Sequence, residues 1–204
     1  MTDDSTIYHE GNRRLQDEFD SRRIADRLEQ VTLHDRFTPG DIEFIQSAPM
    51  FFLATADADG WPDVSYKGGL PGFVQITDYD ELAFPCYDGN GMFKSMGNIL
   101  VNPKVGLLFI DFEGQDRMRV QGSASVSDDD PMMEQFPGAQ LIIRIKAERI
   151  FPNCPRYIHK MQLVEYSVYA PRAEYKPPVP DWKNMPVFHD ALPHKGPAAI
   201  EEEA

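Results

Sequence analysis

The sequence predicts a mainly β protein, an antiparallel barrel or sandwich with short helices beside its strands. The first observation is that short apolar runs follow one another closely, with Gly- or Asp-containing turns between them. Such spacing is typical of antiparallel strands. The second is that no long helices alternate with these runs, as they do in dinucleotide-binding folds. The most apolar run, residues 105–112, is expected to be a central strand.

Before the first strand, the sequence predicts helical structure. Residues 6–31 are highly charged and carry apolar side chains at roughly helical spacing, with a break expected near Ser21. We expect this amphipathic segment to pack outside the main core or across a dimer. Its apolar positions are Leu15, Phe19, Ala25, Leu28 and Val31.

A second helix is predicted to begin at Thr38. Thr38 suits the N-cap, Pro39 the first turn, and Asp41 the position three residues after the cap. The helix should stop near Ser47, ahead of Pro49.

The remaining elements follow from apolar runs and turn residues. A short helix is expected at about 91–101, ended by Asn102-Pro103, and another opens within 128–131. From Pro171 onward the chain is rich in proline and is expected to be an extended tail. The expected division is 1–37 helical extension, 38–165 barrel and 166–204 tail. The expected strands are 50–56, 61–66, 73–77, 82–86, 105–112, 118–126 and 139–150.

Composition narrows the function classes. The 204-residue chain has a formal net charge of −13, which argues against nucleic acid and anionic membranes as partners, because both attract basic surfaces. Its two cysteines form no disulfide framework and suit a reducing compartment. The polar N-terminus shows no signal-peptide pattern, and no apolar run is long enough to span a bilayer. We therefore expect a cytoplasmic, soluble protein.

The turn Gly-Asn-Gly-Met-Phe-Lys-Ser, residues 89–95, carries the strongest chemical signal. It superficially resembles a nucleoside-triphosphate loop, but Phe93 stands where that loop needs glycine and the strand context differs. A helix start with free N–H groups, Lys94 and Ser95 nevertheless suits a phosphate monoester. The alternative is that Asn90 and Gly91 only shape the helix start while Lys94 is solvated; on spacing alone, both interpretations stay open.

Three further groups are weaker candidates. Lys67 precedes several glycines, so a planar ring could approach the backbone there; the alternative is a wide loop with a solvated lysine. Arg117 and Arg119 share one face of a strand, opposite Met118 and Val120, and could reach a phosphate or a partner, or simply be surface arginines.

The last group lies in the polar segment 153–161. Cys154, Arg156 and His159 are residue types found in functional loops. Cys154 has no visible base to activate it as a nucleophile, and no two histidines stand at metal-ligand spacing. No metal site is predicted.

Four stretches, in this order, resemble the FMN-binding split-barrel proteins related to pyridoxamine 5'-phosphate oxidase, and most closely their flavin-nucleotide-binding branch. The resemblance spans roughly residues 38–162. Each stretch alone is only modestly specific for the family, but the four together, in this order, are strong evidence of the resemblance. They read F-F-L-A-T-A-D-A-D-G-W-P-D-V-S-Y-K-G-G from 51, Y-D-G-N-G-M-F-K-S-M-G-N-I-L-V-N-P-K-V-G-L-L-F-I-D-F from 87, R-V-Q-G-S-A from 119 and N-C-P-R-Y-I-H from 153.

The resemblance implies a six-stranded antiparallel split barrel that forms a homodimer, with FMN at the subunit interface. It implies an oxidoreductase acting on an unknown small molecule. The alternatives are a flavin-binding or sensing module without turnover, or the same barrel holding deazaflavin or haem.

Cofactor-binding positions also follow from the resemblance. Residues 63–67 would lie along the flavin ring and ribityl chain, with Lys67 near the ring or phosphate. Phosphate contacts would come from the 90–98 turn and helix, with Arg119 a weaker candidate, while Arg156 would reach the ring edge or the neighbouring subunit. The full set is Asp63, Val64, Ser65, Tyr66, Lys67, Asn90, Met92, Lys94, Ser95, Asn98, Arg119 and Arg156.

The chain also departs from the oxidase itself. Pro62 stands where the oxidase strand has an arginine, and Lys94-Ser95 replaces consecutive basic residues. The oxidase's C-terminal tryptophan and arginine pattern is not recognisable in the proline-rich tail. Oxidation of pyridoxamine 5'-phosphate is therefore not expected.

Overall fold

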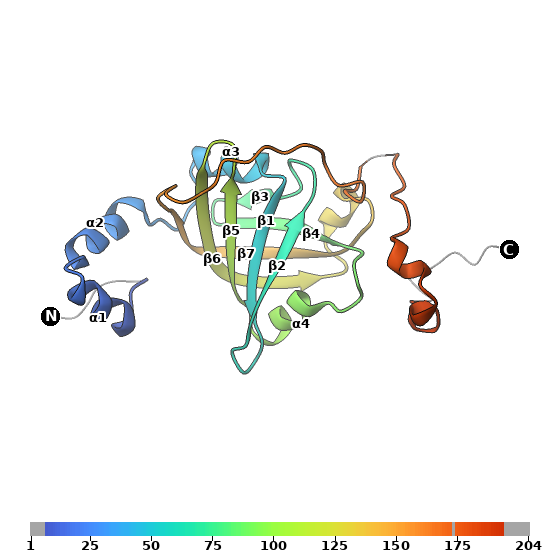
Figure 1. Cartoon of the computed structure of the whole chain (residues 1–204), viewed down its shortest axis with the longest axis horizontal. Coiled ribbons are helices and arrows are strands. Elements are labelled where there is room, and N and C mark those ends of the chain that lie inside the picture. The colour runs from blue at the N-terminus through green and yellow to red at the C-terminus, as the bar shows by residue number, and fades with distance from the viewer. Residues whose placement is uncertain (1–6, 173, 194–204) are drawn as a thin grey trace.

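Seven strands form one antiparallel sheet in the computed structural model, which describes residues 7–172 and 174–193. The strand order is β2-β1-β5-β6-β7-β4-β3, and every neighbouring pair is antiparallel. The sheet is strongly curved, so that β3, β4 and β7 lie behind β1, β2, β5 and β6 (Figure 1). The strands are β1 Met50–Ala56, β2 Pro62–Gly68, β3 Gln75–Asp78, β4 Glu81–Tyr87, β5 Lys104–Asp111, β6 Asp116–Ser127 and β7 Ala139–Pro152.

This architecture confirms the predicted mainly β fold class. The sheet has seven strands where the resemblance implied six. The short strand β3 pairs only with β4 and forms one edge of the sheet, while β2 forms the other. The run predicted to be central is β5, which lies between β1 and β6.

The hydrophobic core fills the space between the two halves of the curved sheet. Alternate residues of each strand point inward, so β1 contributes Phe51 and Leu53, both fully buried. The Phe51 ring lies 5.0 Å from those of Phe84 in β4 and Phe109 in β5. Aromatic contacts from β1 to β4, across the core, join the two halves.

A β-bulge interrupts the pairing of β6 with β7. The pairing register shifts between Gln121 and Gly122. A β-carbon on Gly122 would lie 2.0 Å from the Lys146 carbonyl oxygen, so only glycine permits this approach.

The helices lie at the periphery of the barrel (Figure 1). The predicted N-terminal amphipathic segment is two helices, separated at Asp20, whose φ is 49°, and Ser21. It packs beside the barrel rather than in its core, as predicted. The helices are α1 Glu10–Glu18, α2 Arg22–Thr32, α3 Pro39–Ser47, α4 Lys94–Val101 and the 3₁₀ helices η1 Pro131–Gln135, η2 Asp181–Asn184 and η3 Pro186–Ala191.

Helix α3 begins and ends where the sequence predicted. Thr38 and Asp41 form a reciprocal capping box, and the helix ends at Ser47. The Asp41 carboxylate also lies 2.8 Å from His34 Nε2, which ties the helix to the preceding linker.

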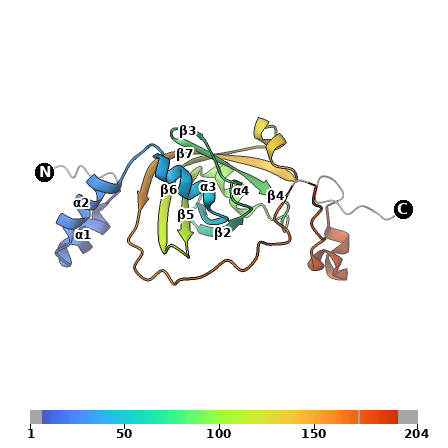
Figure 2. The same cartoon turned by 90° about the horizontal axis from the view of Figure 1, so that it is seen from above.

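After β7 the chain crosses the barrel as an extended segment and reaches η2 and η3 on the far side from α1 and α2 (Figures 1 and 2). The described residues therefore agree with the predicted extended tail, apart from the two 3₁₀ helices. The terminal Glu-Glu-Glu-Ala lies within residues 194–204, which are outside the described residues. The division at 37 and 165 stays a prediction.

Within the described ranges, no helix combines the length and apolar character that crossing a bilayer requires.

Candidate cofactor site

Strand β2 separates its predicted site residues onto two faces. Because side chains alternate along a strand, Asp63, Ser65 and Lys67 share the side that packs toward α4 and the core. Val64 and Tyr66 point the other way and are 65% and 62% exposed. The five predicted residues of β2 therefore form one inner and one outer group.

Ser95 of α4 is the meeting point of the inner group. It is buried, and its Oγ lies 2.9 Å from Ser65 Oγ and donates to Asp63 Oδ2 at 3.3 Å. These contacts place the first turn of α4 directly against β2. The structure thus brings together Asp63, Ser65 and Ser95, which are far apart in sequence.

The N-terminus of α4 has no side-chain cap. Its N-cap residue is Phe93, which adopts a left-handed conformation with φ 47° and ψ 30°, and Lys94 is the exposed first helical residue. By contrast, α1 and α3 have side-chain capping boxes. The first-turn N–H groups of α4 and its helix dipole therefore remain suited to an anion.

Asn90 shapes the turn before α4. Its Oδ1 accepts a hydrogen bond from the Met92 backbone N–H at 3.0 Å, while the Met92 side chain is 71% exposed. Asn90 therefore acts within the turn, as one of the two sequence interpretations proposed. This local bond leaves the α4 N-terminus beside it uncapped.

Asn98 lies on the buried side of α4. Its Nδ2 donates to Thr55 Oγ1 at 3.0 Å, and both residues are buried. This bond holds α4 against β1, so Asn98 supports the helix from beneath. Thr55 was not a sequence candidate, because only the strand pairing shows that it faces α4.

Lys67, at the other end of β2, lies near Cys86 of β4. Burial raises the pKa of the Cys86 thiol, and the positive charge of Lys67 partly opposes that shift. Burial also raises the pKa of the adjacent Tyr87 to about 12, so both groups are protonated at neutral pH. No sequence pattern indicated Cys86 or Tyr87, since strand alternation alone does not reveal their neighbours.

A pocket of about 310 Å³ adjoins this end of β2. The loop after β2 reaches it, because a β-carbon on Gly69 would lie only 2.5 Å from the Phe73 ring that lines the pocket. The lining residues are Leu70, Pro71, Gly72, Phe73, Tyr87, Glu134, Gln135, Phe136, Pro137, Pro171 and Arg172.

Arg119 lies on the outer face of the sheet. It pairs with Leu108 of β5 and Phe151 of β7, and its guanidinium lies 6.0 Å from the Phe151 ring centroid. Burial, and then the nearby positive charge of Arg117, lower the pKa of Arg119. Arg119 therefore belongs with Tyr66 on the outer face rather than with Ser95.

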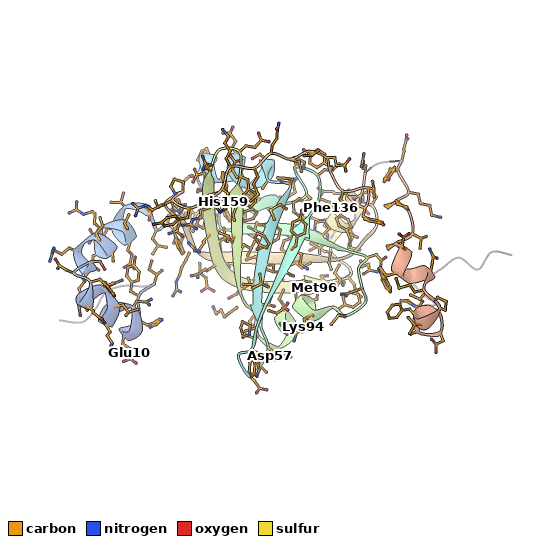
Figure 3. The ribbon with its side chains drawn as sticks, in the orientation of Figure 1. Glu10, Asp57, Lys94, Met96, Phe136 and His159 are labelled. Carbon is orange, nitrogen blue, oxygen red and sulfur yellow. The ribbon has the colours of Figure 1, made fainter. Side chains whose placement is uncertain are left out.

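Arg156 lies near neither the inner nor the outer group of β2 residues. It is exposed in the segment after β7, and His159, three residues later, lies at the opposite end of the barrel from Lys94 (Figure 3). Cys154 in the same segment is also exposed. Among the described side chains, no cluster of three or more His, Cys, Asp or Glu could hold a metal ion.

The sequence profile of the pyridoxamine 5'-phosphate oxidase family matches residues 42–166. The chain belongs to this family. The match runs from α3 through the segment after β7 and therefore includes both β2 and α4. It confirms the resemblance found in the sequence.

Several solved structures of similar fold accompany this match. A putative pyridoxamine 5'-phosphate oxidase from Lactobacillus delbrueckii is 23% identical, with a TM-score of 0.48, and the alignment covers 58% of this chain and 95% of that one. An FAD-binding protein from Mesorhizobium loti is 17% identical, with a TM-score of 0.41 and coverage of 60% and 99%. The haem storage protein of Vibrio cholerae is 22% identical, with a TM-score of 0.39 and coverage of 58% and 92%. None of the curated proteins matches the chain.

Proposed function

We propose that this member of the pyridoxamine 5'-phosphate oxidase family binds FMN and is an oxidoreductase acting on a small molecule. The observation that carries the proposal is the uncapped N-terminus of α4, with Lys94 in its first turn and Ser95 hydrogen-bonded to β2. Backbone N–H groups, an ammonium and a hydroxyl are the donors that a phosphate monoester needs.

The residues around this helix end fit the rest of FMN. Asp63 carries a carboxylate, which accepts hydrogen bonds and repels phosphate, so it suits a ribityl hydroxyl. Strand β2 is an edge strand, so one row of its backbone N–H and C=O groups has no strand partner and can bond the polar edge of a flavin ring. Lys67 supplies a cation at the far end of the same strand.

Bound FMN would supply the electron-transfer chemistry, while the protein binds and orients it. We propose the pocket beside Phe73 and Tyr87 for the small-molecule partner, because it adjoins the Lys67 end of β2. Its mixture of proline, aromatic and polar lining residues suits a compact ligand with polar groups.

We further propose a homodimer with FMN at the interface. The outer face of β2 and β1 exposes Val64 and Tyr66 beside the half-buried Phe52, whose ring lies 6.2 Å from that of Tyr66. The extended tail adds exposed apolar side chains, including Val164, 93% exposed, and Val168. Exposed apolar surfaces of this kind mark protein interfaces.

The dimer is tested by sedimentation of the full-length chain. Tyr66→Asp should shift the protein toward monomer, whereas Tyr79→Asp, at a tyrosine that is 54% exposed in the turn before β4, should not. A wild-type monomer at micromolar concentration, or identical behaviour of both variants, would contradict the proposal.

The cofactor is tested by purification followed by native mass spectrometry and absorption spectroscopy. We expect a yellow protein that retains a ligand with the mass of FMN. A colourless chain that ignores added FMN, or one that retains haem or a deazaflavin, would refute the assignment. Reduction by a nicotinamide donor and reoxidation with a substrate panel would then separate an enzyme from a flavin-binding module without turnover.

A further inference from the structure

Lys183 in the C-terminal segment is buried, although it lies in a part of the chain that is mostly exposed. Its residue exposure is 5%, whereas Met185 is 49% and Val187 is 73% exposed. Among the described residues after β7, only Ala170, Lys183 and Leu192 are buried. A lysine is rarely buried without a specific partner, so this position needs an explanation.

The partner of Lys183 is Asp88, 95 residues earlier in the chain. Lys183 Nζ donates to Asp88 Oδ2 at 2.6 Å, and the lysine side chain is 7% and the aspartate side chain 33% exposed. The Trp182 ring lies 5.8 Å from the same ammonium. Asp88 directly follows β4 and opens the loop that leads into α4 (Figure 1).

This loop, residues 88–93, has a conformation that needs support. Gly91 has a φ of 74° and Phe93 a φ of 47°, and a left-handed phenylalanine persists only when its surroundings hold it. The hydrogen bonds recorded for the Asn90 side chain stay within the loop, at Met92. Among the described side-chain hydrogen bonds and ion pairs of the loop, the Asp88–Lys183 pair is the one that connects the loop to a distant part of the chain.

We propose that Lys183 is a positioning residue for the FMN site. By holding Asp88, it fixes the loop whose end sets the direction of the α4 N–H groups and of Lys94. This inference rests on the proposed phosphate position. Lys183 is the buried partner of this half-buried pair, so loss of Asp88 would leave a buried charge uncompensated, and the pair is screened by salt less than a surface pair.

The test compares FMN dissociation constants of full-length variants by flavin fluorescence quenching. Lys183→Met keeps the aliphatic stem and removes the charge, and we expect roughly tenfold weaker FMN binding because a misplaced binding group costs affinity. Lys104→Met is the matched control: Lys104 Nζ pairs with Glu148 at 2.7 Å, but that pair is 65% and 46% exposed. The control should bind FMN within about twofold of wild type, as expected for an exposed pair.

Two further variants separate positioning from a loss of folding. Asp88→Asn removes the charge and keeps the side-chain size, and it should weaken binding as Lys183→Met does. Combining Asp88→Lys with Lys183→Asp restores an ion pair of reversed polarity and should recover most of the affinity. Wild-type affinity in both single variants would overturn the inference.

Hydrogen exchange of the ligand-free proteins gives a readout that does not depend on FMN. Lys183→Met should speed exchange in residues 88–97 while leaving β5 and β6 protected as in wild type. Unchanged exchange in that stretch would overturn the positioning role even if FMN failed to bind any variant. Failure of the wild-type chain to bind FMN would instead overturn the proposed function, with the exchange result still deciding whether Lys183 positions the loop.

Discussion

At the residue scale, Gly122 shows how one position permits the β-bulge between β6 and β7. The bulge brings the Lys146 carbonyl oxygen to 2.0 Å from where a β-carbon would stand. The neighbouring atom belongs to the backbone, which cannot move aside as the end of a flexible side chain can. Any residue larger than glycine would therefore force β6 and β7 apart.

We predict that Gly122→Ala lowers the free energy of unfolding by about 1–3 kcal/mol, the usual cost of overpacking. Gly97→Ala is the control, because its added methyl group meets nothing within 4 Å and α4 gains a better helix former. Urea denaturation followed by circular dichroism should show opposite shifts for the two variants. Equal stability of Gly122→Ala and wild type would refute the steric account of the bulge.

The site residues show what sequence alone could supply. Lys94 and Ser95 could be proposed because a helix start with donors has a recognisable pattern, and the structure places Ser95 in contact with Ser65 of β2. Thr55 and Asp88 were missed, since their partners come from strand pairing and from the C-terminal segment, which leave no local signal. Arg119 was grouped with the phosphate candidates, but strand alternation places it on the opposite face from Ser95.

At the element scale, local patterns predicted the helices and strands well where the chain itself decides them. The capping box at Thr38 and the stop at Ser47 follow from local hydrogen bonds, and α3 matches the prediction. The start of α4 differs from the prediction. The sequence predicted a helix from about residue 91, but Gly91 and Phe93 adopt left-handed conformations and the helix begins at Lys94. Glycine adopts a positive φ readily, but phenylalanine rarely does, so no local preference predicts the conformation of Phe93.

A charged cluster joins β4, β7 and η1. Arg144 of β7 donates to Asp130, the N-cap of η1, at 2.6 Å and to Glu81 of β4 at 2.8 Å. The Arg144 hydrogen bond holds the pKa of Asp130 below its ordinary value, with a smaller contribution from the Met132 backbone N–H. A lowered carboxyl pKa stabilises the fold above the unfolded pKa of about 3.9 and loses that effect as the pH falls through the folded value.

We predict that Asp130→Asn destabilises the protein by about 1.5–3 kcal/mol at pH 7, the range for a hydrogen bond to a charged group. The difference from wild type should shrink as the pH falls below about 3.9, because Asp130 of the unfolded chain binds a proton there while the folded protein does so only at lower pH. Glu148→Gln is the control: Lys104 also lowers the pKa of Glu148, but that pair is largely exposed, so its effect should be small. A stability difference that is constant from pH 7 to pH 3 would rule out the linkage.

At the scale of the whole molecule, the net charge of −13 opposes the approach of an anionic cofactor. At the proposed site, the N–H groups of α4 and the Lys94 ammonium offset this repulsion, because they would contact the phosphate directly. Long-range repulsion is screened by salt, whereas short contacts in a partly buried site are screened less.

We therefore predict that the FMN association rate rises when ionic strength increases from about 10 to 150 mM, over which the Debye length falls from roughly 30 to 8 Å. Riboflavin, which lacks the phosphate, should associate at a rate that salt hardly changes. Stopped-flow fluorescence measures both rates. An FMN association rate that falls with salt would indicate a dominant basic surface, contrary to this account.

Overall architecture could be predicted because successive short strands leave few alternatives to an antiparallel barrel. The path of the C-terminal segment could not, since its proline-rich composition indicates extension without direction. Only the structure shows that this segment places Lys183 against Asp88.

The central claim is that the N-terminus of α4 holds the phosphate of FMN. Equilibrium titration of the ligand-free chain with FMN and with riboflavin tests it most directly, in wild type and in Lys94→Ala and Ser95→Ala. The account predicts that wild type binds FMN at least tenfold more tightly than riboflavin, consistent with charge-assisted hydrogen bonds to the phosphate, and that both variants narrow this difference. Equal affinity of wild type for FMN and riboflavin, or an unchanged preference in both variants, would contradict it.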